Sequence, residues 1–375
     1  MMLSQRTVWR VIAAILAVLL VGSVSMQAFG LNPFANVALK NGPNATQSSS
    51  TSKLIPLKVA IAGAGSPGSS APEFGVAMGI GAFEAQGLDV KWVSMQPTTN
   101  LLIAALLSKD VQIMTSGISP FFVAAQKDVS ITYFYATQKF GSSSALTVSN
   151  ALKDRVKTPK DLGAISGLRC GTGSPGTTSY ASLEFYMNLE GFKCDAIVNT
   201  ASSAVAVGSM ASGTIDLVVH NVIWGQDAER QGVGYRLIDT SNPDTYKQLF
   251  GDQQVPWTGY LATTEFLKSN PDTVQRYVDA LLTAEMFMRT HTPDQVAAVI
   301  KRSPGIEETP EQIKSSLASV SAFKLTNPGY VSAQDWGGTL PFASTFTRMD
   351  LSGPAFSYGT FWNGDFVQRS LLFIQ

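Results

Sequence analysis

The sequence predicts an α/β protein with two similar lobes, each built around a mostly parallel sheet flanked by helices. Short apolar segments alternate with helical segments, an order that produces parallel sheets. The glycine-rich phrase GAGSPG at 63–68 returns almost unchanged as GTGSPG at 171–176. A second pair of similar segments, 106–119 and 210–223, lies at an offset of 104 residues. Such an offset is too long for a solenoid repeat and fits two related lobes.

The composition excludes several classes of protein. The chain has 375 residues, enough for two ordinary domains, and 45% of them are hydrophobic while 14% are charged. The low charged fraction argues against disorder over most of the chain. Because the formal net charge is zero, we expect no nucleic-acid partner and no binding to an acidic membrane surface.

The first 28 residues have the features of a secretory signal. Arg6 and Arg10 precede an uninterrupted apolar run at 11–21, and small residues follow it as far as Ala28. This order is typical of a cleaved signal peptide. A single membrane anchor is the alternative, but the run is shorter than the roughly 20 residues that a span needs. No cysteine lies near the cleavage region, so we expect a periplasmic protein without a lipid anchor, with a flexible lead-in at 29–53.

The strands and helices are predicted from short apolar runs and from helical stretches bounded by glycine or proline. In the first series, strands are expected at 57–63, 88–93, 111–117 and 129–137, and helices at 71–87, 98–110 and 119–128. In the second series, strands are expected at 145–150, 167–173, 195–200, 214–220 and 234–240, and helices at 158–162, 177–191, 202–213 and 222–232. A strand at 257–264 is then followed by helices at 271–291, 293–303, 310–323 and 358–375.

The repeated Gly-Ser-Pro-Gly turn follows a strand and precedes a helix in both series. Glycines let the backbone approach a ligand closely, and the helix start offers unpaired N–H groups at the positive end of its dipole. With the neighbouring hydroxyls, these groups form a site for an oxyanion or another acceptor-rich ligand. Two copies at corresponding corners favour ligand contact over the alternative, a tight turn with no ligand role. The candidate residues in the two turns are Ser66, Pro67, Gly68, Ser69, Ser174, Gly176, Thr177 and Thr178.

Other strand ends supply further candidates, because ligands of open α/β sheets bind beyond the carboxyl ends of the strands. Ser116 aligns with His220 in the second pair of similar segments, and for His220 both a donor role and a helix-capping role are open. For the tryptophans, two roles are open: they line one side of a site for an organic ligand, or they pack in the core. The candidates in this group are Ser116, Gly117, Ser119, Phe140, His220, Asn221, Trp224 and Trp257.

The two cysteines, Cys170 and Cys194, lie near the starts of two predicted strands that are joined by one helix. Such starts are neighbours in a parallel sheet, so a disulfide is permitted in an exported protein, and two unpaired core residues are the alternative. The cysteines and the two histidines lack the spacing of a metal site, so we expect no metal. We also expect no cofactor and no catalytic residues, because no serine lies in a nucleophile-elbow context.

Several phrases, in their order along the chain, resemble the solute-binding proteins of ABC importers of the nitrate, sulfonate and taurine type. The opening at 57–93 contains G-A-F-E-A-Q-G-L-D-V, which is similar to the family phrase G-x-F-x-x-x-G-L-x-V. The segments 106–129, 158–187 and 210–232 resemble later phrases of the family in the same order. The resemblance covers roughly residues 55–300.

This resemblance implies a type II periplasmic-binding-protein fold, in which two α/β lobes close on a ligand held in the cleft between them. It implies a discontinuous first lobe at 54–143 and 255–375 and a second lobe at 144–254. It also implies a periplasmic monomer that captures a small anion, of the sulfonate, nitrate, bicarbonate or carboxylate type, for the membrane permease subunits of an importer. Donors on both lobes bind one ligand best in the closed state, so the ligand shifts the population toward closure.

Departures from the family pattern bear on the ligand. His220, Asn221 and Val222 stand where relatives often have Trp-Glu-Pro, and the expected ligand loops contain no arginine. A strongly anchored sulfonate or taurine is therefore less expected than a carboxylate, a smaller oxyanion or a neutral polar molecule. Two alternatives share the fold: a protein that binds or makes the pyrimidine precursor of thiamine, and a periplasmic sensor or adaptor. The export signal and the lack of a Schiff-base lysine in the expected loops disfavour the synthase.

Overall fold

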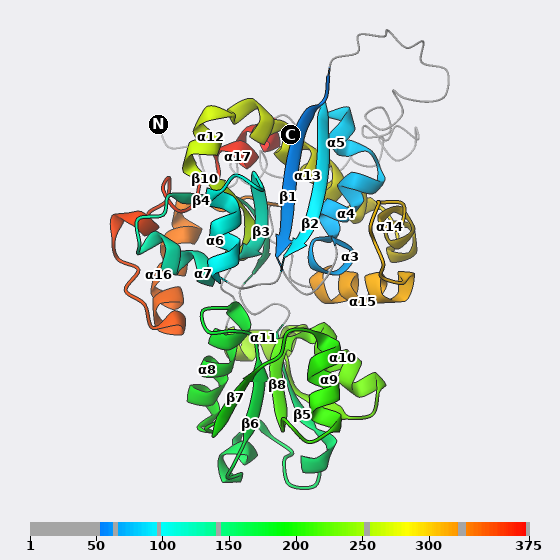
Figure 1. Ribbon diagram of the computed structural model, residues 1–375, viewed down its shortest axis with the longest axis vertical. Coiled ribbons are helices and arrows are strands. Elements are labelled where there is room, and N and C mark those ends of the chain that lie inside the picture. Colours follow the sequence, from blue (N-terminus) through cyan, green and yellow to red (C-terminus); the bar gives the residue numbers. More distant parts are fainter. Residues whose placement is uncertain are drawn as a thin grey trace, which may run out of the picture. The chain divides into compact units, whose positions relative to one another are not determined.

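The computed structural model describes residues 53–62, 67–95, 99–139, 144–250, 256–321 and 328–372. The predicted signal peptide at 1–28, and the lead-in up to residue 52, lie outside these residues. The described residues form two five-stranded sheets, and helices flank both of them (Figure 1).

The first sheet has the strand order β2-β1-β3-β10-β4. Its strands are β1 (Ile55–Ala62), β2 (Leu88–Met95), β3 (Ile113–Gly117), β4 (Ile131–Lys139) and β10 (Pro256–Thr263). β1 pairs in parallel with β2 and β3, whereas β10 is antiparallel to both of its neighbours. Four strands therefore share one direction, and β10 runs against them between β3 and β4.

The second sheet has the strand order β7-β6-β8-β5-β9. Its strands are β5 (Ser144–Ser149), β6 (Arg169–Thr172), β7 (Ala196–Asn199), β8 (Leu217–Asn221) and β9 (Gly234–Asp239). β6 pairs in parallel with β7 and β8, whereas β5 is antiparallel to β8 and β9. Four strands again share one direction, with the opposed strand in the fourth position.

The two sheets match strand for strand. β2, β1, β3, β10 and β4 have the same order and relative directions as β7, β6, β8, β5 and β9. β3 and β8 are both five residues long, and their first residues are Ile113 and Leu217, the offset noted in the sequence. The predicted class, two mostly parallel sheets flanked by helices, is confirmed. The boundaries given for the two lobes remain a prediction.

The helices cover both faces of each sheet. Around the first sheet, α4, α13 and α14 share a core with one face, and α6, α7 and α16 share a core with the other (Figure 1). The described helices are α3 (Pro67–Ser70), α4 (Pro72–Gly79), α5 (Ala82–Ala85), α6 (Thr99–Leu107), α7 (Ser119–Ala125), α8 (Thr178–Glu190), α9 (Ser203–Ala211), α10 (Val222–Arg230), α11 (Pro243–Phe250), α12 (Thr264–Ser269), α13 (Pro271–Thr290), α14 (Pro293–Ile300), α15 (Pro310–Ser321), α16 (Ala333–Thr347) and α17 (Asp365–Leu372), with 3₁₀ turns η1 (Asn150–Leu152), η2 (Pro159–Ala164) and η3 (Pro354–Phe356).

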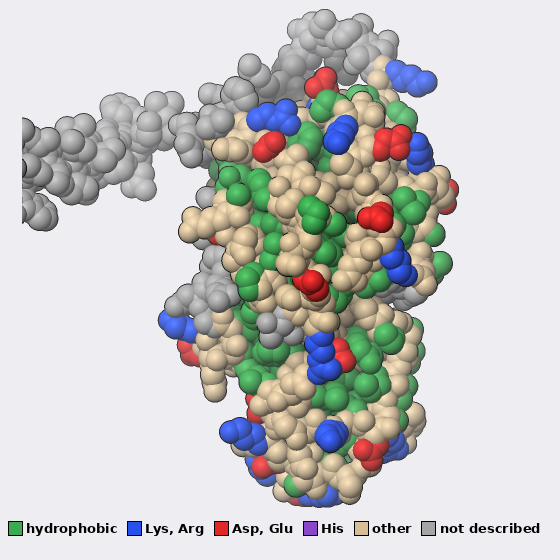
Figure 2. Space-filling model, turned by 90° about the vertical axis from the view of Figure 1, so that its left-hand side faces the viewer, with side chains coloured by type: hydrophobic (Ala, Val, Ile, Leu, Met, Phe, Trp, Pro, Cys, Tyr) green, Lys and Arg blue, Asp and Glu red, His purple; other side chains and the backbone are tan. Residues whose placement is uncertain are grey.

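Charged side chains are scattered over the face that Figure 2 shows. Lysine and arginine lie there singly or beside an acidic group, as the formal net charge of zero leads one to expect. This face therefore offers no broad surface of one sign. Within the described ranges, none of the helices combines the length and the apolar character that a bilayer crossing requires.

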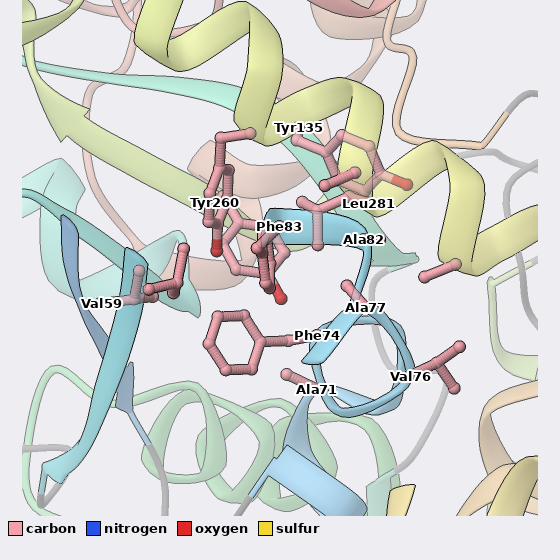
Figure 3. Close-up of a cluster of buried hydrophobic side chains, with 14 of the residues drawn as sticks. Val59, Ala71, Phe74, Val76, Ala77, Ala82, Phe83, Tyr135, Tyr260 and Leu281 are labelled. Carbon is pink, nitrogen blue, oxygen red and sulfur yellow. The ribbon is translucent and has the colours of Figure 1, made fainter. Parts of the chain in front are cut away.

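One face of the first sheet is covered by an aromatic core. Figure 3 shows Phe74, Phe83 and Tyr260 lying together there, and the ring centroids of Phe74 and Phe83 are 5.2 Å apart. The Tyr260 hydroxyl donates to the buried carboxylate of Glu73 over 2.8 Å. This bond ties the start of α4 to β10.

Two glycines let α4 and α14 approach each other closely. A Cβ at Gly79 would lie 2.2 Å from the carbonyl oxygen of Val299, and a Cβ at Gly75 would lie 3.2 Å from Cγ2 of Ile300. Gly75 and Gly79 are four residues apart and so share one face of the helix. The contact between the two helices therefore depends on the absence of side chains at these positions.

Two predicted helices differ in extent from the observed ones. The helix predicted at 71–87 is divided into α4 and α5, because Gly81 between them has a left-handed backbone with φ of 70°. The helix predicted at 358–375 is represented among the described residues by α17 alone. The residues before α17 instead form a turn that a bridge between Tyr358 and Trp362 closes.

Four observed helices, α3, α11, α12 and α16, have no predicted counterpart. α16 contains Pro341 in its interior, which removes a helical hydrogen bond, so local propensity disfavours it. Its buried side chains Trp336 and Phe346 pack against neighbouring aromatic rings. Tertiary packing therefore stabilises a helix that the sequence pattern does not predict.

A disulfide joins Cys170 in β6 to Cys194 ahead of β7, with the two Cα atoms 5.8 Å apart. Of the two arrangements that the sequence left open for these cysteines, the structure has the bridge. It closes a loop that contains α8 and fastens two neighbouring parallel strands at their start. The bridge therefore restrains the start of β6, the strand whose other end leads into the second repeated turn.

Removing this bridge is expected to lower the free energy of unfolding by about 3 kcal/mol, because the closed loop constrains the unfolded chain. Urea unfolding of the double variant Cys170→Ser, Cys194→Ser measures the change. Dithiothreitol should destabilise the wild-type protein by a similar amount and leave the variant unaffected. Equal stability of both proteins under oxidising conditions would contradict a stabilising role for the bridge.

Candidate functional site

The predicted site residues that the structure describes lie at or just beyond the carboxyl ends of β1, β3, β6 and β8, and at the start of the antiparallel β10. These four strand ends lead into α3, α7, α8 and α10, so strand ends and helix starts meet at corresponding edges of the two sheets. In open α/β sheets this is the edge that holds ligands. Ser66, Phe140 and the side chain of Ser69 lie outside the described residues, so their roles stay predictions.

The first repeated turn is described from Pro67 onward. Pro67 and Gly68 open α3, and both are buried. A Cβ at Gly68 would lie 3.1 Å from Cγ1 of Ile313 and 3.3 Å from the carboxyl group of Glu308. The short helix α3 is thus held close to α15, a helix from the C-terminal part of the chain.

The second repeated turn is stabilised by its own hydroxyl groups. Thr177 caps α8: its Oγ1 accepts from the backbone N–H of Tyr180 over 3.4 Å and donates to the carbonyl of Ser174 over 2.7 Å. The side-chain amide of Asn199, at the end of β7, donates to Oγ of Ser174 over 3.0 Å. Gly176 has φ of 85°, which a tight corner requires. The Thr177 hydroxyl therefore makes hydrogen bonds that stabilise the turn and the start of α8.

Thr178, the next residue, is the first residue of α8 and contacts strands of the first sheet. The indole N–H of Trp257, from β10, donates to Oγ1 of Thr178 over 3.2 Å. A Cβ at Gly117, the last residue of β3, would lie 2.4 Å from the same oxygen. The carbonyl of Gly117 in turn accepts from the Tyr133 hydroxyl over 2.8 Å. The structure thus brings together three predicted site residues, Gly117, Thr178 and Trp257.

Aromatic rings continue from this contact. The Trp257 ring is 2% exposed and lies 5.1 Å from Phe346 of α16, which lies 5.6 Å from Phe185 of α8. A separate polar contact joins α15 to α10, where the Ser315 hydroxyl donates to Oε1 of Gln226 over 2.6 Å. Helices of the first sheet therefore touch helices of the second at two places, one aromatic and one polar.

The end of β3 carries two predicted serines. Ser116 is buried within the strand, at 6% exposure. Ser119 opens α7, and its Oγ is buried and has no hydrogen-bond partner within the described part of the chain. A buried hydroxyl without a partner is uncommon in folded proteins and calls for an explanation. Ser119 therefore has hydrogen-bonding capacity that a ligand at this edge can use.

His220 lies near the end of β8, just ahead of α10. Its ring stacks on Trp224, with the centroids 3.5 Å apart and the planes inclined by 5°. Nδ1 is buried and has no hydrogen-bond partner in the residues that the structure describes, while the residue as a whole keeps some exposed surface. Burial lowers the pKa of His220 to about 3, and the Asn221 side chain acts in the opposite direction. The imidazole is therefore neutral at physiological pH.

The helix-capping role that the sequence left open for His220 belongs to Asn221. Its side-chain oxygen accepts from the backbone N–H of Trp224 over 3.3 Å. Trp224 is 4% exposed and packs in the core beside α9 and α10. Trp224 therefore packs against one face of the His220 ring.

Acid is expected to destabilise the protein through His220. Because burial depresses the pKa, the folded state binds the proton less readily than the unfolded chain, and stability falls as pH drops from about 6.5 toward 3. The variant His220→Asn lacks this component, so its melting temperature should fall less than that of the wild type between pH 7 and pH 4. Thermal unfolding monitored by circular dichroism tests this. Equal declines in the two proteins would contradict the depressed pKa.

Several residues that support the site were not predicted from the sequence. Asn199 ends β7 and is the donor to Ser174, and Tyr133 holds the end of β3. Asn199 is the last residue of a strand, so the strand-end rule that selected the other candidates would have found it. Tyr133 lies inside a strand, and its partner is a backbone carbonyl sixteen residues away in the sequence, for which there is no local signal.

The sequence between residues 65 and 302 matches the model of the NMT1-like family. The chain belongs to the NMT1-like family. The comparison with curated proteins gives no match. The family assignment agrees with the type of protein that the sequence phrases suggested.

Solved structures place this NMT1-like chain in the periplasmic-binding-protein fold. The periplasmic nitrate-binding protein NrtA from Synechocystis PCC 6803 matches with a TM-score of 0.65 and 11% identity, over 86% of this chain and 90% of that one. The ligand-binding component of an ABC-type import system from Staphylococcus aureus gives 0.63 and 12%, over 84% and 99%. The alkanesulfonate-binding protein SsuA from Xanthomonas axonopodis pv. citri gives 0.60 and 16%, over 79% and 94%. The expected fold is thereby confirmed.

Not every matching structure is named as a binding protein. The desulfurization enzyme DSZB matches with a TM-score of 0.55 and 14% identity, over 86% of this chain and all of that one. Among the residues that the structure describes, no group of three or more His, Cys, Asp or Glu side chains is placed to hold a metal ion. Binding proteins and enzymes share this fold, so whether a protein binds or catalyses depends on the residues at the strand ends.

Proposed function

We propose that this NMT1-like protein is the periplasmic solute-binding component of an ABC importer, without catalytic activity. The observation that carries the proposal is the contact of β3 with the start of α8, where Gly117, Thr178 and Trp257 meet. These residues stand at the ligand-binding edges of two matching sheets. A ligand at this position touches both sheets and is bound best when they are close together.

The ligand is a small oxyanion. α8 and α10 start directly beyond the strand ends, and the positive ends of their dipoles favour negative charge there. Ser119 Oγ is a buried polar atom that has no partner among the described residues, and His220 is a neutral residue at the end of β8. Two of the solved structures with this fold are named as nitrate- and alkanesulfonate-binding proteins, which supports the same class of ligand.

A thermal-shift screen tests this function. The chain from residue 29 onward is heated with nitrate, bicarbonate, acetate, methanesulfonate, taurine and a pyrimidine. An oxyanion at 100 times its Kd should stabilise the folded protein by about 2.7 kcal/mol and raise its melting temperature by several degrees. A shift with the pyrimidine alone would favour the thiamine-precursor alternative, and no shift with any oxyanion would overturn the proposal.

The partners follow from the same proposal. The liganded protein is a monomer that docks on the membrane permease subunits of the importer. Sedimentation of the exported chain with and without ligand should give a single species near the 40.0 kDa of the full chain less its signal peptide. A stable dimer would contradict the monomeric part of the proposal.

A further inference from the structure

The last peptide group of β3 is held at both of its polar ends. The carbonyl of Gly117 accepts a hydrogen bond from the Tyr133 hydroxyl over 2.8 Å. The N–H of the same peptide group belongs to Ile118 and donates to the carbonyl of Trp257 over 2.8 Å. Because a peptide group is planar, holding its C=O and its N–H fixes the orientation of the whole group. The end of β3 is therefore oriented by one side chain of β4 and by the backbone of β10.

Tyr133 is itself fixed by residues near the C-terminal end of the described chain. Its ring stacks on Phe361 and on Trp362, with centroids 5.5 Å and 5.3 Å away. Its backbone N–H donates to the carbonyl of Phe361 over 2.8 Å, and its carbonyl accepts from the N–H of Asn363 over 2.7 Å. Burial raises the pKa of Tyr133 well above its ordinary value, so the hydroxyl stays protonated at physiological pH. The hydroxyl is thus a permanent donor on a side chain that other contacts hold in place.

Gly117 is also the residue through which β3 contacts α8. A Cβ added to Gly117 would lie 2.4 Å from Oγ1 of Thr178, so the backbone there is already close to that side chain. The same oxygen accepts from the indole N–H of Trp257 over 3.2 Å. A rotation of the peptide group after Gly117 would change its distance from Thr178. The Tyr133 hydroxyl therefore influences a contact in which Tyr133 takes no part.

We propose that Tyr133 is a positioning residue for the candidate site, because its hydroxyl orients the peptide group after Gly117 and thereby sets the contact of β3 with Thr178. This inference rests on the proposed function for the ligand and on the observed hydrogen bonds for the positioning. Tyr133 acts through Gly117 and does not have to touch the ligand. Its effect on binding should therefore disappear when the contact between Gly117 and Thr178 is removed.

Tyr135 provides a matched control on the same strand. It follows Tyr133 by two residues on β4, is equally buried, and packs in the core on the other face of the sheet. Its hydroxyl has no hydrogen-bond partner among the residues that the structure describes. Removing a buried hydroxyl that makes no hydrogen bond carries no penalty. Tyr133→Phe and Tyr135→Phe thus remove the same group with and without a hydrogen bond.

Hydrogen exchange tests the positioning without any ligand. In ¹⁵N-labelled protein, we expect the Ile118 amide to exchange about fivefold faster in Tyr133→Phe, the factor that the loss of about one hydrogen bond gives. Tyr135→Phe should leave the exchange rate of Ile118 unchanged. Unchanged exchange at Ile118 in Tyr133→Phe would overturn the inference, whatever the protein binds. An equal acceleration in β6 and β8 would indicate a general loss of stability and would overturn it as well.

Calorimetry with nitrate, acetate and methanesulfonate then tests the role in binding. For an oxyanion that binds the wild type, we expect Tyr133→Phe to raise Kd about fivefold or more, as for two coupled positions. Tyr135→Phe should leave Kd unchanged. Unchanged affinity in Tyr133→Phe would overturn the binding role. If no oxyanion binds the wild type, the proposed function fails together with this role, while hydrogen exchange still decides whether Tyr133 orients the peptide group.

The variant Thr178→Ala tests the route through Gly117. In this background the side-chain oxygen next to Gly117 is absent, so the orientation of the peptide group matters less to the contact with α8. Tyr133→Phe should then change Kd by less than about twofold, since two changes on one route are not additive. An equal loss of affinity in the wild-type and Thr178→Ala backgrounds would overturn the proposed route.

Discussion

Replacing Gly117 by alanine is expected to weaken oxyanion binding by about 5- to 150-fold while the unliganded protein stays folded. The added Cβ would lie 2.4 Å from Oγ1 of Thr178, which is far inside van der Waals contact. Overpacking typically costs about 1–3 kcal/mol, and here the cost falls on the conformation in which β3 touches α8. Because the ligand requires that conformation, the cost appears in Kd. Isothermal titration calorimetry with the tightest oxyanion of the screen measures it.

The double variant Gly117→Ala, Thr178→Ala is the matched control. With Oγ1 removed, the nearest remaining atom of residue 178 would be its Cβ at 3.6 Å, an ordinary contact distance. Affinity should therefore return toward that of Thr178→Ala alone, which loses only the hydrogen bond from Trp257. A double variant as weak as Gly117→Ala would contradict a steric origin of the effect.

Replacing Gly79 by alanine is expected to lower the free energy of unfolding by about 3 kcal/mol, near the upper end of the usual range for overpacking. The new Cβ would lie 2.2 Å from the carbonyl oxygen of Val299 and 2.9 Å from its carbonyl carbon. These are backbone atoms, so they cannot rotate away as a side chain can. The crossing of α4 and α14 must open instead, and urea unfolding reports the loss.

Gly208 supplies the comparison for this variant. It lies inside α9, is exposed, and a Cβ there would meet no atom within 4 Å. Gly208→Ala should raise the free energy of unfolding by about 0.5–1 kcal/mol, since alanine loses less conformational freedom in a helix. If the two variants changed stability by similar amounts, close packing at Gly79 would not be the reason for its glycine.

The strands were predictable because each is a short apolar run framed by polar residues, glycine or proline. The segment at 257–264 was identified as a strand in this way. Its position between β3 and β4 was not, since the partners of a strand are not encoded in its own residues. α16 escaped prediction for the complementary reason: Pro341 weakens the local signal, and the buried Trp336 and Phe346 that stabilise the helix find their partners elsewhere in the chain.

The site was predictable in location more than in detail. Strand ends pointed to Thr177, His220 and Asn221, and all three lie at such corners. The sequence did not distinguish side chains that cap a helix from side chains that do not. Thr177 and Asn221 accept hydrogen bonds from backbone N–H groups at the start of a helix, whereas His220 does not. The closeness of Gly117 to Thr178 is a contact across two sheets, which no local pattern contains.

The position of β10 determines which of the two sheets can be completed first while the chain is being synthesised. The second sheet is complete once Asp239 has been made, because its five strands follow one another between Ser144 and that residue. The first sheet begins earlier but must wait for Pro256–Thr263, since β3 and β4 touch β10 and not each other. Loop closure over such a distance costs entropy and slows folding. A chain that emerges from its N-terminus therefore finishes its second sheet first, and during that interval its first sheet lacks the strand that joins β3 to β4.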